Sequence, residues 1–152
     1  MEIFRISKKK HGEHLSGIGA KQHGGRWTNV GIEVIYCAGT RSLAMLELLA
    51  QNIDLSVLLR DYYCFVIKIP QNSKTEIVQD KDLFKGWDSP THNIRLKNLG
   101  DDWFKRQNSL LYRVPSAVVG GEFNYIINPL HKEFNKIKVH IEIFPFDLRL
   151  AP

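Results

Sequence analysis

The sequence predicts a single α+β domain with a strand-dominated core and one buried helix. Two apolar runs, Ile32–Ala38 and Tyr62–Ile69, have the length and composition of buried strands. In Ile137–Ile143, apolar residues alternate with lysine, histidine and glutamate, a period of two that is typical of a half-buried strand. The one strong helical segment is Arg41–Gln51, and it follows Thr40, a suitable N-cap residue.

The sequence signals for the remaining helices and strands are weaker. Three further strands are expected at Glu2–Ser7, Ser109–Val114 and Phe123–Ile127, the last two ending at prolines or just before them. A short helix is expected to start at Asp101-Asp102. The segment from Gly12 to Gly31 is rich in glycine, so it is expected to have an irregular backbone, either as a loop or as a surface that a ligand approaches closely.

Length and composition are those of one globular domain covering residues 1–152. The chain is 43% hydrophobic and 24% charged, which argues against intrinsic disorder. No apolar run approaches the ~20 residues that a membrane-spanning helix needs, and the first residues do not resemble a signal peptide. A cytoplasmic protein without membrane contact is therefore expected. Cys37 and Cys64 lie in apolar runs and are interpreted as buried thiols rather than as a disulfide or a metal pair.

The chain is basic, with 21 lysines and arginines against 16 acidic residues, a formal net charge of +5. Such a charge attracts phosphate-bearing molecules and acidic proteins without selecting among them. Together with Trp27, Trp87 and Trp103, it leaves open a nucleic-acid-binding module or a ribonuclease toxin. Against that alternative, the basic residues are scattered and no nucleic-acid-binding motif is present.

Glu47 is the most informative residue of the predicted helix. It is the only polar side chain between Leu43 and Ala50, and on a helix it shares one side with Leu43 and Leu46. A carboxylate buried without a partner is costly, so Glu47 must meet a cation, hydrogen-bond donors or a cavity. The alternative is that it lies at the helix edge, where it reaches water or forms a structural ion pair.

The run Gly24-Gly25-Arg26-Trp27 and the strand residue Tyr36 are further candidates. Paired glycines let the backbone come close to a ligand, and the Arg26 guanidinium is a planar donor fork suited to phosphate or carboxylate. Trp27 is either a stacking surface for a base or a core residue. A tyrosine within a strand, such as Tyr36, is usually a core residue whose hydroxyl is hydrogen-bonded.

Several other motifs of known function are incomplete or absent in this sequence. Residues 17–22 contain two glycines of a dinucleotide-binding fingerprint but lack the third, and no phosphate-binding loop or nucleophile elbow is present. His11 and His14 have the spacing of metal ligands but lie in a glycine-rich loop without an obvious further ligand set. No metal is therefore expected.

Arg26, Glu47 and Ser116 together point to a known family. The chain resembles RES-domain proteins, which are named for an arginine, a glutamate and a serine and are toxins of bacterial toxin–antitoxin pairs. The likeness covers almost the whole chain, except that residues 70–108 match nothing specific. The matching segments are Leu15-Ser16-Gly17 with Gly19-Ala20, Gly24-Gly25-Arg26-Trp27 with Asn29 and Gly31, Val34-Ile35-Tyr36, residues 42–47, residues 113–118, residues 122–124, residues 128–131 and residues 146–149.

The resemblance implies a fold similar to the catalytic domain of ADP-ribosyltransferase toxins, with NAD⁺ as a substrate and no bound cofactor. It implies cleavage of the nicotinamide–ribose bond by an NAD⁺ glycohydrolase or phosphorylase, the latter with inorganic phosphate as co-substrate. The alternative within the same chemistry is mono-ADP-ribosylation of a protein. The resemblance also implies a cognate helix-turn-helix antitoxin that blocks the active site, so that the toxin contacts DNA only indirectly, through the antitoxin. A homodimer is left open as a possibility.

The same resemblance assigns roles to individual residues. Glu47 would stabilise the positive charge that develops on the ribose as nicotinamide leaves, since that transition state resembles an oxocarbenium ion. Arg26 would neutralise the pyrophosphate or an attacking phosphate. Tyr36 would pack against the nicotinamide or its ribose, and Trp27 would offer a stacking surface where the family often has tyrosine.

Three polar residues complete the expected site. Ser116 would donate a hydrogen bond to the substrate rather than act as a nucleophile, because no histidine or acid lies near it in the sequence to activate it. Asn124 and Asn128 are weaker candidates for contacts with the substrate. The alternative for both asparagines is loop capping.

Overall fold

The structure is a computed structural model that describes residues 1–8, 15–51, 62–91, 93–144, 146, 147 and 149. Its strands are β1 (Glu2–Lys8), β2 (Ile35–Ala38), β3 (Tyr62–Lys68), β4 (Thr75–Ile77), β5 (Leu111–Pro115), β6 (Phe123–Ile127) and β7 (Lys138–Ile143). Its helices are α1 (Ile18–His23), α2 (Arg41–Leu49) and α4 (Ile94–Arg106), with short 3-10 turns η1 (Asp80–Asp82) and η2 (Phe134–Lys136).

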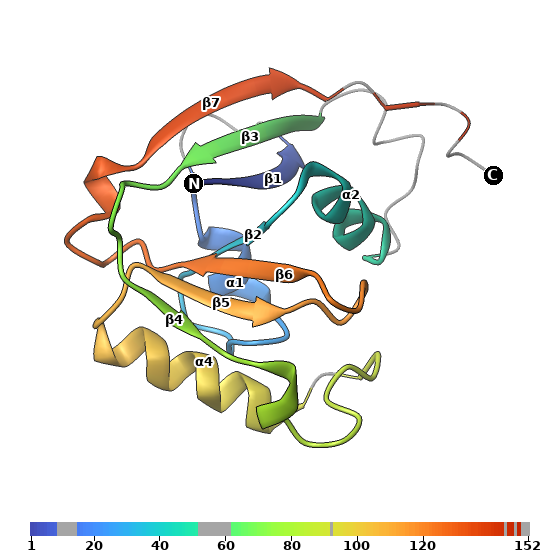
Figure 1. Cartoon of the computed structure of the whole chain (residues 1–152), viewed down its shortest axis with the longest axis vertical. Helices are drawn as coiled ribbons and strands as arrows, with labels where there is room; N and C mark the ends of the chain where they lie inside the picture. Colours follow the sequence, from blue (N-terminus) through green and yellow to red (C-terminus); the bar gives the residue numbers. More distant parts are fainter. Residues whose placement is uncertain (9–14, 52–61, 92, 145, 148, 150–152) are drawn as a thin grey trace.

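The strands form one sheet in the order β4-β5-β6-β2-β1-β3-β7 (Figure 1). The β4–β5 pair is parallel and every other pair is antiparallel. Neighbours β1 and β2 share a single register pair, Phe4 with Ala38, whereas the other neighbours share three or more. The sheet therefore consists of two halves joined at one narrow contact. The predicted α+β class with a strand-dominated core is confirmed.

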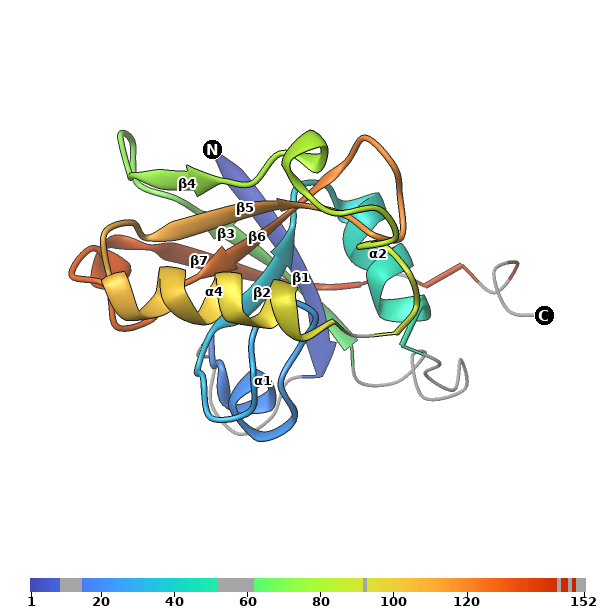
Figure 2. The same cartoon turned by 90° about the horizontal axis from the view of Figure 1, so that it is seen from below.

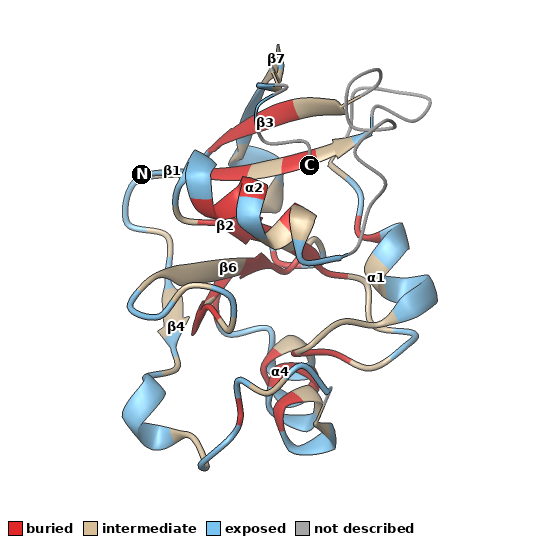
Figure 3. Ribbon diagram, turned by 90° about the vertical axis from the view of Figure 1, so that its right-hand side faces the viewer, coloured by how far each residue is buried: buried red, intermediate tan, exposed pale blue. Residues whose placement is uncertain are grey.

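Two helices lie on the same face of the sheet. Helix α2 packs against β1 and β2, so it lies over the junction of the two halves, where Leu43 contributes to a core cluster with Phe4 and Ala38. Helix α4 lies across the half that contains β5 and β6 (Figure 2), and its Leu96 joins a cluster with Tyr112 of β5. Figure 3 shows that the buried residues are concentrated on the strands and on one side of α4. The face between the two helices is where the candidate residues come together.

Helix α4 is longer than expected, because it begins well before the Asp101 at which the sequence placed its start. The side chain of Asn93 caps the first turn. Leu96, Gly100 and Trp103 are buried at a spacing of i, i+4 and i+7, and they form the inner side of the helix. The polar residues of the first two turns lie on the outer side, which hides the helical period in the sequence.

Three other expectations need correction. The glycine-rich segment contains the short helix α1, which ends at Gly24 with φ of +70°, a conformation that favours glycine. The sequence did not predict β4, a three-residue strand. Strand β7 is present, but it is an edge strand with little burial, and Ile143 is 79% exposed rather than half-buried.

The two cysteines are free and buried, as expected. Burial raises the pKa of the Cys37 thiol to about 12 and also raises the pKa of Cys64. In the part of the chain that the structure describes, no helix is long and apolar enough to cross a bilayer.

These thiols provide a test of the core. Because both are buried and protonated, the native protein at pH 8 is expected to be inert to a thiol reagent, and both thiols should become reactive in one step as urea unfolds the chain. The measurement is the number of thiols modified against urea concentration, beside a far-UV circular dichroism curve. Rapid modification of either thiol in the absence of urea would contradict the core described above.

Candidate active site

Glu47 lies in the last turn of α2, where hydrogen-bond donors from two distant segments meet its carboxylate. The helix begins at the N-cap Thr40, whose Oγ1 accepts a hydrogen bond from the Leu43 amide at 3.0 Å. Ser116 Oγ donates to Glu47 Oε1 at 2.8 Å, and Asn124 Nδ2 donates to the same oxygen. Of the possibilities that the sequence left open, the structure thus shows a carboxylate held by donors.

The two carboxylate oxygens of Glu47 differ in their contacts with the described residues. Among the described residues, none forms a hydrogen bond or an ion pair with Oε2. The side chain is half-buried, so it is neither sealed in the core nor fully in solvent. The two hydrogen bonds thus fix the orientation of the carboxylate through one oxygen only, an arrangement that suits a carboxylate acting on a ligand.

Ser116 holds Glu47 and has no hydrogen-bonding capacity left over. It directly follows β5 and is buried, with 4% of its surface exposed. Its Oγ accepts from the amides of Val118 and Val119, both at 3.1 Å, while its proton goes to Glu47. The hydroxyl proton that the sequence assigned to the substrate is directed at Glu47 in this structure, and it orients that carboxylate.

Asn124 approaches Glu47 from β6. It is paired with Ala38 across the β2–β6 ladder, and Ala38 belongs to the core cluster under α2, so both side chains face this helix. Its Nδ2 points at the carboxylate, because the reverse orientation of the amide would bring two oxygens together. Its Oδ1 is buried and has no hydrogen-bond partner among the residues described.

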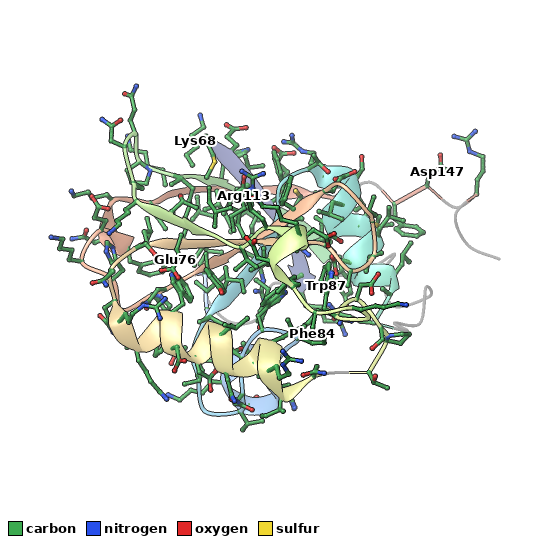
Figure 4. All side chains as sticks on the ribbon, turned by 60° about the horizontal axis from the view of Figure 1, so that its bottom comes forward. Lys68, Glu76, Phe84, Trp87, Arg113 and Asp147 are labelled. Carbon is green, nitrogen blue, oxygen red and sulfur yellow. The ribbon has the colours of Figure 1, made fainter. Side chains whose placement is uncertain are left out.

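Arg26 lies on the loop between α1 and β2. Its Nη1 donates to two backbone carbonyls, those of Trp87 at 3.1 Å and Ser89 at 3.0 Å. Figure 4 shows Trp87 close to Phe84, between the sheet and α4. Within the described chain, Nε and Nη2 of Arg26 have no hydrogen-bond partner, so part of the donor fork is available to an anion.

Tyr36 connects the Arg26 loop to the sheet. Its hydroxyl accepts a hydrogen bond from the Trp27 amide at 3.2 Å and lies 2.9 Å from Thr28 Oγ1. A Cβ added at Gly25 would stand 2.5 Å from this hydroxyl, so the glycine makes the close approach possible. Burial raises the pKa of Tyr36 to about 12, which keeps the hydroxyl protonated. The hydroxyl has the internal role that the sequence gave as the alternative.

The two charged groups lie on one face of the sheet. Tyr36 is paired with Ile126, two residues along β6 from Asn124, and such diagonal neighbours on one face are ~7–8 Å apart. The loop with Arg26 rests on the hydroxyl of Tyr36, and Glu47 rests on Asn124. Glu47, through Asn124, and the Arg26 loop, through Tyr36, are therefore attached to the same stretch of β2 and β6.

Two predicted site residues have buried side chains. Trp27 is a core residue with 2% exposure, packed against Trp87 at 6.0 Å between ring centroids and edge-on to Tyr112. Asn128 is fully buried just after β6, four residues or ~13 Å from Asn124. Its Oδ1 accepts from the Leu130 amide, the loop capping that the sequence offered as the alternative, and its Nδ2 donates to the carbonyl of Phe104 on α4.

A metal centre is not found in the residues that the structure places, since none of their histidine, cysteine and acidic side chains form a group of three or more suited to an ion. His11 and His14 lie outside the described residues.

The sequence missed the contributions of residues 80–106. Two of them are the backbone carbonyls that hold Arg26, and such contacts leave no signature in side-chain type. A third is Asp101, which is 8% exposed and binds Asn29 through both carboxylate oxygens. An acidic residue on the inner half of an amphipathic helix was the one available signal, and it depended on recognising α4.

Known proteins resemble this chain over most of its length. The model of the RES domain family matches residues 2–149. The chain belongs to the RES domain family. It is 38% identical to Toxin Res of Photorhabdus laumondii over 137 residues, which cover 90% of this chain and 86% of that protein. It is 35% identical over 129 residues to the Prs ADP-ribosylating toxin of a Sphingobium strain, with coverage of 83% and 79%.

The RES fold is also seen in a solved structure. A chain of the M. tuberculosis MbcT–MbcA toxin–antitoxin complex superposes with a TM-score of 0.72 over 91% of this chain and 80% of that chain. The two share 17% sequence identity, so this similarity establishes the fold alone.

The hydrogen bonds of Ser116 give a prediction for stability. In Ser116→Ala, the amides of Val118 and Val119 lose their acceptor and Glu47 loses a donor, so the free energy of unfolding should fall by about 1–2 kcal/mol. Urea denaturation measures this. Ser42→Ala, at an exposed position on α2, is the matched control and should stay within ~0.5 kcal/mol of the parent. Equal stabilities of the two variants would show that Ser116 does not have this role.

Proposed function

We propose that this RES-domain protein is a toxin that consumes NAD⁺ by breaking the nicotinamide–ribose bond. The observation that carries the proposal is the Glu47 carboxylate, with Oε1 held by Ser116 and Asn124 and Oε2 free. A carboxylate oriented in this way is suited to stabilise an oxocarbenium-like ribose. The names of its relatives, toxins and an ADP-ribosylating toxin, support the same chemistry.

The proposed reaction assigns a role to each free group. The bond between the ribose anomeric carbon and the nicotinamide nitrogen breaks, and its electron pair leaves with nicotinamide. Glu47 Oε2 faces the sugar as positive charge develops, while the free donors of Arg26 hold the pyrophosphate. Water, which loses a proton to solvent, or inorganic phosphate then forms a bond to the anomeric carbon through one oxygen, giving ADP-ribose or its phosphate ester.

Transfer of ADP-ribose to a protein is the second candidate. It differs only in the acceptor that attacks the same carbon, and the relative named as a Prs ADP-ribosylating toxin favours it. Glu47 and Arg26 would have the same roles in both reactions.

The proposed partner is an antitoxin. The structural neighbour comes from a toxin–antitoxin complex, and the net charge of +5 of this chain suits an acidic inhibitory surface. We propose that a cognate helix-turn-helix antitoxin covers the Glu47 site and provides the contact with DNA.

Glu47→Gln tests the central role. Glutamine keeps an oxygen that can accept from Ser116 and Asn124 but loses the charge, so NAD⁺ turnover should fall by ~10²–10³-fold with little change in melting temperature. Release of nicotinamide, followed by chromatography, is the measurement. Glu2→Gln on β1, a neutralisation of the same type at an exposed position, should retain full turnover. Near-normal turnover by Glu47→Gln would refute the mechanism.

Product analysis tests the acceptor. Purified protein with labelled NAD⁺ is expected to release nicotinamide together with ADP-ribose in phosphate-free buffer, or with ADP-ribose phosphate when inorganic phosphate is supplied. A discrete labelled protein after addition of cell extract, with little free product, would favour the transferase. An unchanged NAD⁺ pool under all three conditions would exclude both reactions.

A further inference from the structure

Helix α4 directly contacts the backbone of Trp27, the residue after Arg26. A Cβ added at Gly100 would stand 1.8 Å from the carbonyl oxygen of Trp27, so the helix and this loop are in contact without a side chain between them. Only a glycine permits such an approach. The next residue, Asp101, is 8% exposed. Its Oδ1 accepts from the Asn29 amide at 3.0 Å and its Oδ2 from Asn29 Nδ2 at 2.8 Å.

The loop that carries Arg26 is therefore held at two successive points. Tyr36 binds the backbone of Trp27 and the side chain of Thr28 from below, where the loop rests on the sheet. Asp101 binds the backbone and the side chain of Asn29 from α4. Arg26 precedes these anchored residues directly, and its guanidinium then reaches the carbonyls of the segment before α4.

We propose that Asp101 is a positioning residue for Arg26, acting through Asn29. Its carboxylate only accepts hydrogen bonds, so it requires donors from both the amide and the side chain of Asn29 and thereby sets the orientation of the loop. Among the described residues, no lysine or arginine forms an ion pair with this carboxylate, which leaves Asn29 as its partner. The inference deepens the proposed function, on which its activity measurements rest.

A displaced guanidinium should weaken substrate binding more than chemistry. Arg26 is assigned to the anionic part of NAD⁺, which does not change during bond cleavage, so losing its alignment removes binding that the ground state and the transition state share. Asp101→Ala is therefore expected to raise KM for NAD⁺ about tenfold while kcat changes less than about threefold. A merely structural role would instead lower the amount of active protein and leave KM unchanged.

Exchanging the residue types at positions 29 and 101 tests whether KM can be restored. In Asn29→Asp alone, two carboxylates would face each other, and KM should rise at least as much as in Asp101→Ala. In Asn29→Asp with Asp101→Asn, the new amide at 101 can donate to the carboxylate at 29 and accept from its backbone N–H. KM should then return to within about threefold of the parent, a coupling that a double-mutant cycle detects. Asp102→Asn, an exposed neighbour on the same helix, is the control and should not change KM.

Amide hydrogen exchange provides a readout that does not depend on activity. The Asn29 amide should exchange slowly in the parent and in the double variant, and at least tenfold faster in Asp101→Ala. If the parent leaves NAD⁺ intact, the proposed function fails, while the exchange rates still decide whether Asp101 anchors the loop. An unchanged KM in Asp101→Ala, no recovery of KM in a folded double variant, or equal exchange rates would each overturn the inference. The double variant also covers the case in which Asp101→Ala does not fold.

Discussion

The two hydrogen bonds to one oxygen of Glu47 are the interaction on which the site depends. They join α2 to the end of β5 and the start of β6, through donors 69 and 77 residues away in the sequence. Because both donors use Oε1, they stabilise the carboxylate and orient it without occupying Oε2. A carboxylate with a purely structural role would have both oxygens hydrogen-bonded, and a fully exposed carboxylate would not be fixed in orientation. A carboxylate held through one oxygen only is the feature of this fold that supports the proposed reaction at the ribose.

Arg26 is held in a comparable way, through some of its atoms only. Its guanidinium is fixed at Nη1 by two backbone carbonyls, and its loop is fixed by Tyr36 and Asp101. The segment that matches nothing specific in the family resemblance, residues 70–108, thus provides much of the support for a residue that the resemblance does identify.

The sequence predicted those parts of the molecule that depend on local pattern. The helix around Glu47 has a local N-cap and an apolar surface, so its position and its one polar residue were evident. Side-chain orientation depends on tertiary neighbours, and for that reason Ser116 was expected to face substrate although its hydroxyl faces Glu47. Trp27 shows the same limit, because a glycine-rich setting does not reveal that its ring will join a core cluster with Leu96 and Trp103 of α4. The sequence analysis did not identify Asp101 as a site residue, because the polar residues on the exposed side of α4 obscure the helical period of its buried residues.

A structure of the protein with a carbocyclic NAD⁺ analogue, whose nicotinamide cannot be released, tests the central claim most directly. The account predicts that Glu47 Oε2 lies within hydrogen-bond distance of a hydroxyl on the nicotinamide-bearing ring, while Oε1 keeps its bonds to Ser116 and Asn124. Binding of the analogue away from α2, or a carboxylate that leaves both donors when the analogue binds, would contradict it.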